Sequence, residues 1–150
     1  MNLRLKSIIM KNKTLRVLII EDSNNDYILL LRELNKGDYQ IEDCLVDDAI
    51  GFEKALLQSW DIIISDYSLP TFSGYDALKM CIDKSIDTPF IIVSGAVGED
   101  KAEQMMKLGV KDYIMKSSLA KLLSAVEKEI EDAQIRKESR QAEGALKISE

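Results

Sequence analysis

Five polar residues with the chemistry of an anion-accepting site lie at or next to the ends of apolar runs: Glu21, Asp22, Asp66, Ser94 and Lys116. Three carboxylates held close together repel one another unless a cation joins them. Mg²⁺ suits such a group, because it prefers carboxylate, carbonyl, water and phosphate oxygens. A lysine adds a point positive charge, and a serine adds a hydroxyl donor. Together these residue types favour a site where one carboxylate accepts a phosphoryl group.

The positions of these residues depend on alternating strand and helix patterns. Short apolar runs predict strands at residues 15–20, 39–46, 61–65, 89–95 and 110–115. Helical spacing of apolar residues occurs in segments 26–37, 48–58, 74–84 and 99–109, and a long helical pattern begins at residue 118. Continuously apolar strands are typical of a parallel sheet covered on both faces. We therefore expect an α/β fold: a doubly wound, five-stranded parallel sheet in the order 2-1-3-4-5, with helices on both faces and an extended C-terminal helix.

The expected sheet places the polar residues at one edge, because ligands of such sheets lie beyond the carboxyl ends of the strands. The first and third strands are neighbours about 4.8 Å apart, so Glu21 and Asp22 should lie close to Asp66. Each residue also has an ordinary explanation: an aspartate can cap a turn or a helix, and a lysine can be solvated. The functional interpretation is favoured only because all five polar residues coincide at one edge.

Composition narrows the possible functions. The formal net charge of −6 disfavours nucleic-acid binding through bulk charge. Histidine is absent, which excludes Ser/His and Cys/His nucleophiles and histidine-ligated metals. Cys44 and Cys81 lie in apolar segments without metal-ligand spacing, which favours reduced core thiols over a disulfide. Apolar runs are too short for a signal peptide or a membrane span, so we expect a cytoplasmic protein with no membrane contact.

Several apolar residues are expected to serve only the fold. Ile28, Leu31, Leu57 and Met105 are predicted to lie in the core, and Trp60 to pack before the third strand. The alternating segment 39–46 is typical of an edge strand, because successive side chains of a strand point to opposite faces.

The order and spacing of the polar residues resemble the receiver domain of two-component response regulators. The matching elements are Glu21-Asp22, Asp66 with Pro70 and Gly74 four and eight residues later, Ser94-Gly95, and Tyr113-x-x-Lys116. The resemblance covers residues 14–137 and implies a flavodoxin-like receiver fold. It leaves residues 1–13 as a disordered leader and residues 138–150 as a helical linker.

The resemblance implies a role for each residue near the third strand. Asp66 would be the phosphoacceptor, attacking a phosphohistidine of a sensor histidine kinase or a phosphotransfer protein. Asp22, Asp66 and the main-chain carbonyl of Ser68 would bind Mg²⁺, and Glu21 would act mainly through a metal-bound water.

The resemblance also implies a conformational switch. Lys116 would pair with the new phosphoryl group, and Ser94 would hydrogen-bond one of its oxygens. Tyr113 would then swing inward and change the surface formed by residues 99–109, the fifth strand and the last helix. A homodimer could form through this surface or through the C-terminal helix.

The sequence departs from the family pattern after the lysine. Ser117 stands where the family usually has a proline after a cis peptide bond, so the Lys116–Ser117 bond could be trans, or cis and strained. Ser68 and Ala96 lie where the family tunes dephosphorylation. The stretch VSGAVGED (93–100) resembles receivers that are fused to, or partnered with, sensor kinases.

A helical pattern continues past the expected domain. Leu119, Leu122, Val126, Ile130 and Ala133 form an apolar stripe that can pack on the sheet. The final stretch RQAEGALKISE resembles the connector before a PAS domain in hybrid sensor kinases, and a frayed charged C-terminus is the open alternative. A DNA-recognition helix does not follow, so DNA-binding output is not expected from this chain.

Three functions are compatible with these residues. The first is a phosphorylatable signalling switch, which is not an enzyme beyond slow loss of its own phosphoryl group. The second is a phosphatase or phosphotransferase of the haloacid-dehalogenase type, which needs Asp-x-Asp after the first strand, whereas Glu21 and Asp22 are adjacent. The third is a degenerate receiver that binds partners without phosphorylation, which the complete set of phosphorylation residues argues against.

Overall fold

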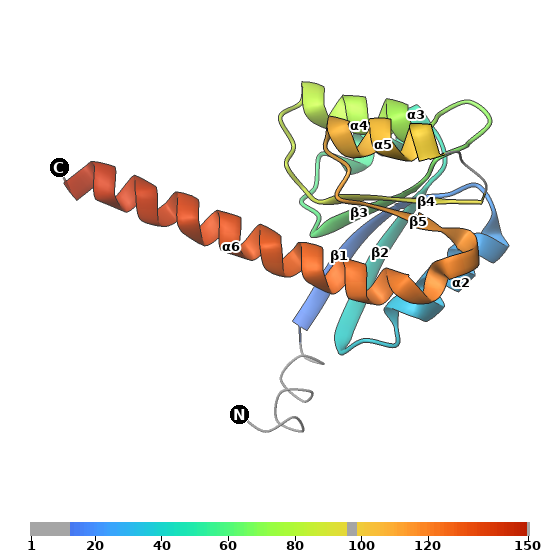
Figure 1. The fold of residues 1–150 in the computed structure, drawn as a ribbon, viewed down its shortest axis with the longest axis horizontal. Coiled ribbons are helices and arrows are strands. Elements are labelled where there is room, and N and C mark those ends of the chain that lie inside the picture. The colour runs from blue at the N-terminus through green and yellow to red at the C-terminus, as the bar shows by residue number, and fades with distance from the viewer. Residues whose placement is uncertain (1–12, 96–98, 150) are drawn as a thin grey trace.

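The structure of the chain is a computed structural model that describes residues 13–95 and 99–149 (Figure 1). Its strands are β1 (Lys13–Ile20), β2 (Tyr39–Val46), β3 (Ile62–Asp66), β4 (Phe90–Ser94) and β5 (Asp112–Met115). Its α-helices are α2 (Asn24–Leu34), α3 (Ala49–Ala55), α4 (Gly74–Asp83), α5 (Glu99–Leu108) and α6 (Leu122–Ser149). A 3-10 helix, η1 (Lys116–Lys121), precedes α6. The predicted strands and helices are all present, with some ends displaced by a few residues.

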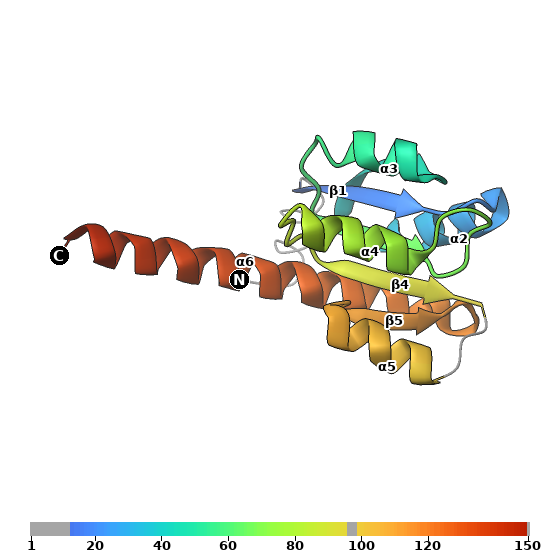
Figure 2. The same ribbon diagram turned by 90° about the horizontal axis from the view of Figure 1, so that it is seen from above.

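The five strands form one parallel sheet in the order β2-β1-β3-β4-β5. In the register of β1 and β3, Leu18 lies opposite Ile63. Helices α3, α4 and α5 cover one face of the sheet, and α2 and α6 cover the other (Figures 1 and 2). The expected doubly wound α/β fold with an extended C-terminal helix is therefore confirmed.

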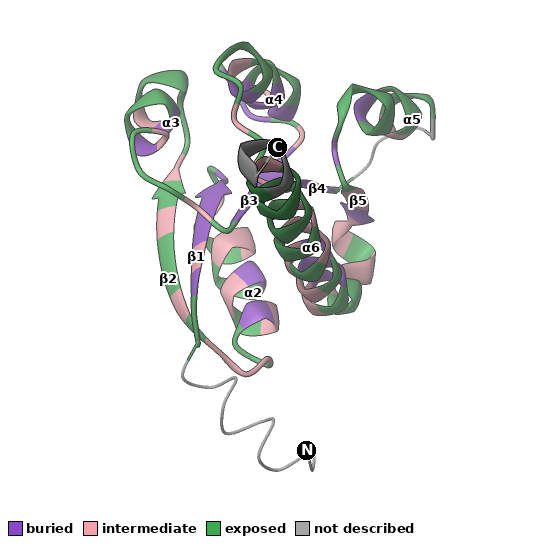
Figure 3. Cartoon of the chain, turned by 90° about the vertical axis from the view of Figure 1, so that its left-hand side faces the viewer, coloured by how far each residue is buried: buried purple, intermediate pink, exposed green. Residues whose placement is uncertain are grey.

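Two hydrophobic clusters, one on each face of the sheet, hold these layers together. Alternate residues of a strand point to opposite faces, so Ile63 belongs to the cluster under α3, α4 and α5, and Ile62 and Ile64 to the other. All residues of β3 and β4 are buried (Figure 3). Coverage of both faces explains why these strands are continuously apolar until their last positions. The alternating exposure of β2 at one edge agrees with its prediction as an edge strand.

The predicted core was wrong at two positions. Ile28 of α2 is 46% exposed and Leu57 is 87% exposed, whereas Met105 is buried as expected. In α2 the buried residues are Leu30 and Leu34, because the helix turns another side of its apolar surface toward the sheet. Leu57 follows the end of α3, where the chain has already turned away from the sheet.

The smaller packing predictions agree with the structure. Leu31 is partly buried against the cluster under α2 and α6. Trp60 is also partly buried, and its indole N–H donates to the Ala55 carbonyl at 2.8 Å. Cys44 and Cys81 are free thiols.

Helix α6 is continuous and leaves the body of the domain (Figure 2). The first part of the predicted stripe packs on the sheet, with Leu122 and Val126 buried and Ile130 partly buried. The boundary that we predict at residue 137, between the domain and a helical linker, falls inside this helix and stays a prediction. None of the helices in the described part of the chain combines the length and apolar character that a membrane crossing needs.

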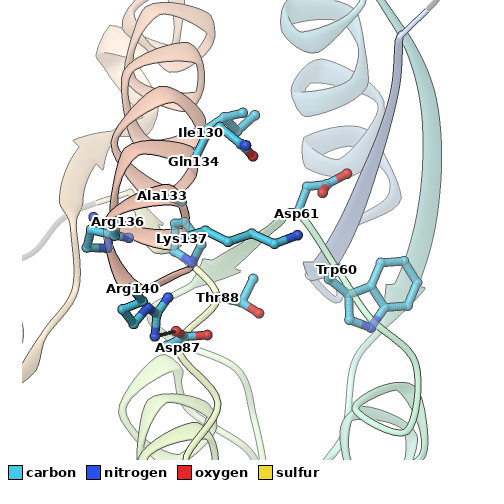
Figure 4. Close-up of a pocket in the computed structure, with 11 residues that line it drawn as sticks. Trp60, Asp61, Asp87, Thr88, Ile130, Ala133, Gln134, Arg136, Lys137 and Arg140 are labelled. Carbon is cyan, nitrogen blue, oxygen red and sulfur yellow. Dashed lines mark hydrogen bonds and ion pairs between the residues drawn. The ribbon is translucent and has the colours of Figure 1, made fainter. Parts of the chain in front are cut away.

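A hollow of about 220 Å³ lies between α6 and the loops that precede β3 and β4 (Figure 4). Beside it, Arg140 of α6 pairs with Asp87 at 2.8 Å and ties the outer part of the helix to the loop before β4. This hollow lies at the amino ends of the strands, opposite the predicted site. The expected leader lies outside the described residues except for Lys13, which opens β1.

Candidate functional site

The carboxyl ends of β1 and β3 bring three carboxylates together. Glu21 and Asp22 directly follow β1, and Asp66 is the last residue of β3. One carboxylate oxygen from each residue lies within 4.8 Å of the others. Glu21 and Asp66 are buried, whereas Asp22 is exposed. The acidic cluster is therefore open to solvent on the side of Asp22, and its oxygen donors fit a hard cation such as Mg²⁺.

The turn after β1 holds the carboxylate of Glu21. Its Oε1 accepts hydrogen bonds from the backbone N–H groups of Asp22 (3.1 Å) and Ser23 (3.0 Å). Burial raises the pKa of Glu21 from 4.5 to about 7; the Ser23 N–H opposes this rise, and the charge of Asp66 adds to it. Burial therefore favours the protonated carboxyl of Glu21 more than it would be favoured in a solvated glutamate. A bound cation would favour its ionised form.

Lys116 joins the acidic cluster from the residue after β5. Its Nζ lies 3.3 Å from Glu21 Oε2, 3.2 Å from Asp66 Oδ2 and 2.6 Å from Asp26 Oδ2. Burial lowers the pKa of Lys116, but these three carboxylates outweigh burial and hold the pKa above its usual range. A positive charge therefore lies directly beside Asp66. The peptide bond that joins Lys116 to Ser117 is trans.

Gly74 closes the loop that follows Asp66. The Gly74 N–H donates to the Tyr67 carbonyl at 3.0 Å, and Asp66 Oδ1 accepts from the Ser68 N–H at 3.3 Å. A Cβ at residue 74 would lie 2.8 Å from the Ile92 side chain and 3.0 Å from the Asp66 carbonyl oxygen. The loop approaches the sheet too closely for any side chain at this position, which explains a glycine eight residues after Asp66.

Ser94 and Tyr113 lie on the other side of Asp66. A hollow of about 310 Å³ is lined by Asp66, Tyr67, Ser68, Ser94, Gly95, Lys101 and Lys116. The Tyr113 hydroxyl is buried, and none of the described residues forms a hydrogen bond of normal geometry with it. Burial raises the pKa of Tyr113, and the nearby Ser94 hydroxyl opposes the rise. The two hydroxyls are therefore neighbours. Ala96 lies outside the described residues.

Known proteins share this fold. A family model of the response regulator receiver domain matches residues 17–127. The chain belongs to the response regulator receiver family.

Individual relatives of the receiver support this membership. The chemotaxis protein CheY of Treponema pallidum is 28% identical over 103 residues, which cover 67% of this chain and 72% of CheY. The cell cycle response regulator CtrA of Brucella ovis is 31% identical over 105 residues, which cover 68% of this chain and 44% of CtrA. The receiver thus spans less than half of CtrA. The signal receiver domain of a putative Luxo repressor protein from Vibrio parahaemolyticus has a similar structure, with a TM-score of 0.71 and 28% identity over 83% of this chain and 95% of that chain.

Asp26 was not predicted from the sequence, although its carboxylate makes the shortest of the three contacts to Lys116 in the receiver. The pattern Ser23-x-x-Asp26 is typical of the start of a helix, and Ser23 Oγ does accept from the Asp26 N–H at 3.3 Å. That local pattern gives no sign of a contact to a lysine 90 residues away.

Lys101 was also not predicted. It lies in the first turns of α5, its Nζ is 5.5 Å from the centre of the Tyr67 ring, and it lines the hollow beside Asp66. The hollow therefore has a second lysine besides Lys116. The sequence places Lys101 near the start of a helix that follows a strand end, but nothing in its neighbours distinguishes it from a solvated lysine.

Proposed function

We propose that the receiver is a phosphorylatable signalling switch in which Asp66 accepts a phosphoryl group. The donor would be a phosphohistidine of a sensor histidine kinase or a phosphotransfer protein. The observation that carries the proposal is the Lys116 ammonium, 3.2 Å from Asp66 Oδ2 at the acidic cluster. A carboxylate oxygen of Asp66 attacks phosphorus, an O–P bond forms as the P–N bond to histidine breaks, and the electron pair leaves with the imidazole.

The residues around Asp66 fit Mg²⁺ as the ion required for this transfer. Asp22, Asp66 and the main-chain carbonyl of Ser68 would hold the ion, and Glu21 would act through a bound water. The ion, when bound, offsets the negative charge shared by the carboxylates and the phosphoryl oxygens. Support comes from the three clustered carboxylate oxygens and from the raised pKa of Glu21, because burial disfavours its charged form even with Lys116 at 3.3 Å.

Phosphorylation would alter the surface formed by α5, β5 and α6. Lys116 pairs with the phosphoryl group, and Ser94 donates its hydroxyl to a phosphoryl oxygen. Tyr113 then moves into the space that opens. The Tyr113 hydroxyl already lies buried beside the Ser94 hydroxyl, so a shift of Ser94 toward a phosphoryl oxygen would act directly on Tyr113. We also propose that the receiver acts in the cytoplasm. If it forms a homodimer, the interface would be this surface or α6.

In this proposal the receiver is a phosphoacceptor that slowly loses its phosphoryl group by hydrolysis, and it does not act as an enzyme on other substrates.

Two other functions, a degenerate receiver and a phosphatase, are less well supported. A degenerate receiver would not need the Lys116–Asp66 contact at 3.2 Å. A phosphatase with paired aspartates would not need a buried Glu21 beside an exposed Asp22. Nucleic acid is not a proposed partner, because the net charge is −6.

Intact-mass measurement tests the proposal. After incubation with acetyl phosphate and Mg²⁺, the wild-type chain should gain the mass of one phosphoryl group and Asp66→Asn should not. Asp76→Asn removes an exposed carboxylate from the start of α4 and should be phosphorylated like wild type. A wild-type chain that gains no mass from acetyl phosphate or from a phosphorylated kinase would contradict the switch. Turnover of a small phosphate ester would favour the phosphatase.

A further inference from the structure

The chain contains the pattern Ser-x-x-Asp at the start of two helices, and the two aspartates have different partners. At α4, Asp76 Oδ2 accepts from the Ser73 N–H (3.0 Å), and Ser73 Oγ accepts from the Asp76 N–H (3.1 Å), a complete capping box. At α2, Ser23 Oγ accepts from the Asp26 N–H, but the Asp26 carboxylate lies 2.6 Å from Lys116 Nζ. The carboxylate of Asp26 therefore binds Lys116 instead of the Ser23 N–H that its pattern predicts as a partner.

Two neighbouring residues, Glu21 and Lys116, explain why Asp26 does not complete a capping box. The Ser23 N–H, which a capping box would join to Asp26, donates to Glu21 Oε1 at 3.0 Å. Lys116 lies closer to Asp26 than to Asp66 (3.2 Å) or Glu21 (3.3 Å). The side chains of Asp26 and Lys116 are only 33% and 25% exposed, so water screens this pair less than a pair on the open surface. The shortest contact of the Lys116 ammonium is thus to Asp26, which is neither the phosphoacceptor nor a proposed metal ligand.

We propose that Asp26 is a positioning residue that holds Lys116 in the unphosphorylated receiver, and that phosphorylation transfers Lys116 from Asp26 to the phosphoryl group. This inference rests on the function proposed above. An ammonium group has three N–H donors, and Lys116 already faces three carboxylates. Two of these contacts are hydrogen bonds, to Asp26 and Asp66. A phosphoryl group on Asp66 would enter the hollow that Lys116 lines and Asp26 does not, so donation to a phosphoryl oxygen draws Lys116 away from Asp26.

Removal of the Asp26 carboxylate should therefore strengthen the binding of a phosphoryl group at Asp66. The unphosphorylated state loses the contact that competes for Lys116, whereas the phosphorylated state loses nothing that it uses. We expect Asp26→Asn to bind the phosphoryl analogue beryllofluoride roughly two- to fivefold more tightly than wild type, the range that partly exposed ion pairs allow.

Fluorine NMR of bound beryllofluoride, titrated in the presence of Mg²⁺, measures this affinity. Asp76→Asn is the matched control, because it removes the same charge from the same position of the other Ser-x-x-Asp pattern. It measures how far a lost negative charge alone favours an anionic ligand. Asp26→Glu keeps a carboxylate and should remain close to wild type. Asp26→Ser is a second neutral variant.

The side-chain carbon and nitrogen NMR shifts of Lys116 report the resting pair without any ligand. They should change in Asp26→Asn and Asp26→Ser, and remain the same in Asp76→Asn. Such a selective change would not follow from a general loss of helix stability at α2. It therefore separates a positioning role from a merely structural one.

Three results would overturn the inference. Equal affinities of Asp26→Asn and Asp76→Asn would show that only general charge matters. Weaker binding by Asp26→Asn would show that Asp26 holds Lys116 toward the phosphoryl group. Unchanged Lys116 shifts in Asp26→Asn would show that Asp26 and Lys116 do not pair in the unphosphorylated receiver. The function proposed above would remain intact. A wild-type chain that binds no beryllofluoride would instead overturn the proposed function, and the exchange of Lys116 with it.

Discussion

Replacement of Glu21 by glutamine tests whether the acidic cluster destabilises the fold when no cation is bound. Burial raises the pKa of Glu21 from 4.5 to about 7, and with its side chain only 1% exposed, water does little to reduce the effect. As pH rises, the unfolded chain loses this proton first, so the folded state loses stability between about pH 4.5 and 7. At ~1.4 kcal/mol for each pKa unit, the loss amounts to about 3 kcal/mol at pH 8.

Glu21→Gln is neutral at every pH and should not show this loss. Its amide oxygen can still accept from the N–H groups that Glu21 Oε1 binds, those of Asp22 and Ser23. In Mg²⁺-free buffer the free energy of unfolding of the variant should exceed that of wild type by about 3 kcal/mol at pH 8, and by less than about 1 kcal/mol at pH 5. Urea denaturation followed by circular dichroism gives both values.

The exposed Glu103 supplies the control, since Glu103→Gln should leave the pH dependence of stability unchanged. Parallel stability curves for wild type and Glu21→Gln between pH 5 and 8 would refute a buried Glu21 carboxyl with a raised pKa. The same result would also remove one support for a cation at the cluster.

Three further substitutions, the first with Gly144→Ala as its control, test contacts within the receiver. Gly74→Ala places a Cβ 2.8 Å from a β4 side chain and should lower the free energy of unfolding by about 1–3 kcal/mol; Gly144→Ala, in open space on α6, should be neutral or stabilising in the same urea titration. Tyr27→Phe removes the hydrogen bond from Tyr27 to Asp43, which raises the Tyr27 pKa to about 12, and should cost about 1 kcal/mol in thermal unfolding. Arg140→Ala breaks an exposed ion pair and should change stability by less than about 1 kcal/mol, while hydrogen exchange in the outer turns of α6 should become faster.

The sheet and its polar edge were predictable because both depend on short-range patterns. A continuously apolar strand is needed wherever helices cover both faces, so Ile62 to Ile64 mark β3 directly. The carboxyl ends of parallel strands meet at one edge, so Glu21 and Asp66 could be placed together without knowledge of any side-chain contact. The structure confirms that their carboxylates lie in one cluster with Asp22.

The helix faces and the partners of individual charges were not predictable in this way. In α2 several apolar residues follow one another, so helical spacing selects Ile28 as readily as Leu30, and only the angle at which the helix meets the sheet decides between them. Asp26 had an equally good local partner in the Ser23 N–H. Its actual partner, Lys116, is distant in sequence and depends on how β5 and α2 meet across the sheet edge.

The turn between β1 and α2 connects Glu21 of the acidic cluster to Asp26, and through Asp26 to Lys116. Glu21 Oε1 occupies the Ser23 N–H, and that N–H is the one group at the start of α2 that a capping box would offer to Asp26. As long as Glu21 holds it, Asp26 pairs with Lys116 instead. Any change that draws Glu21 away from Ser23 therefore gives Asp26 a second partner and makes Lys116 easier to release. We expect the buried glutamate to influence the lysine more through this shared backbone N–H than through its own contact at 3.3 Å.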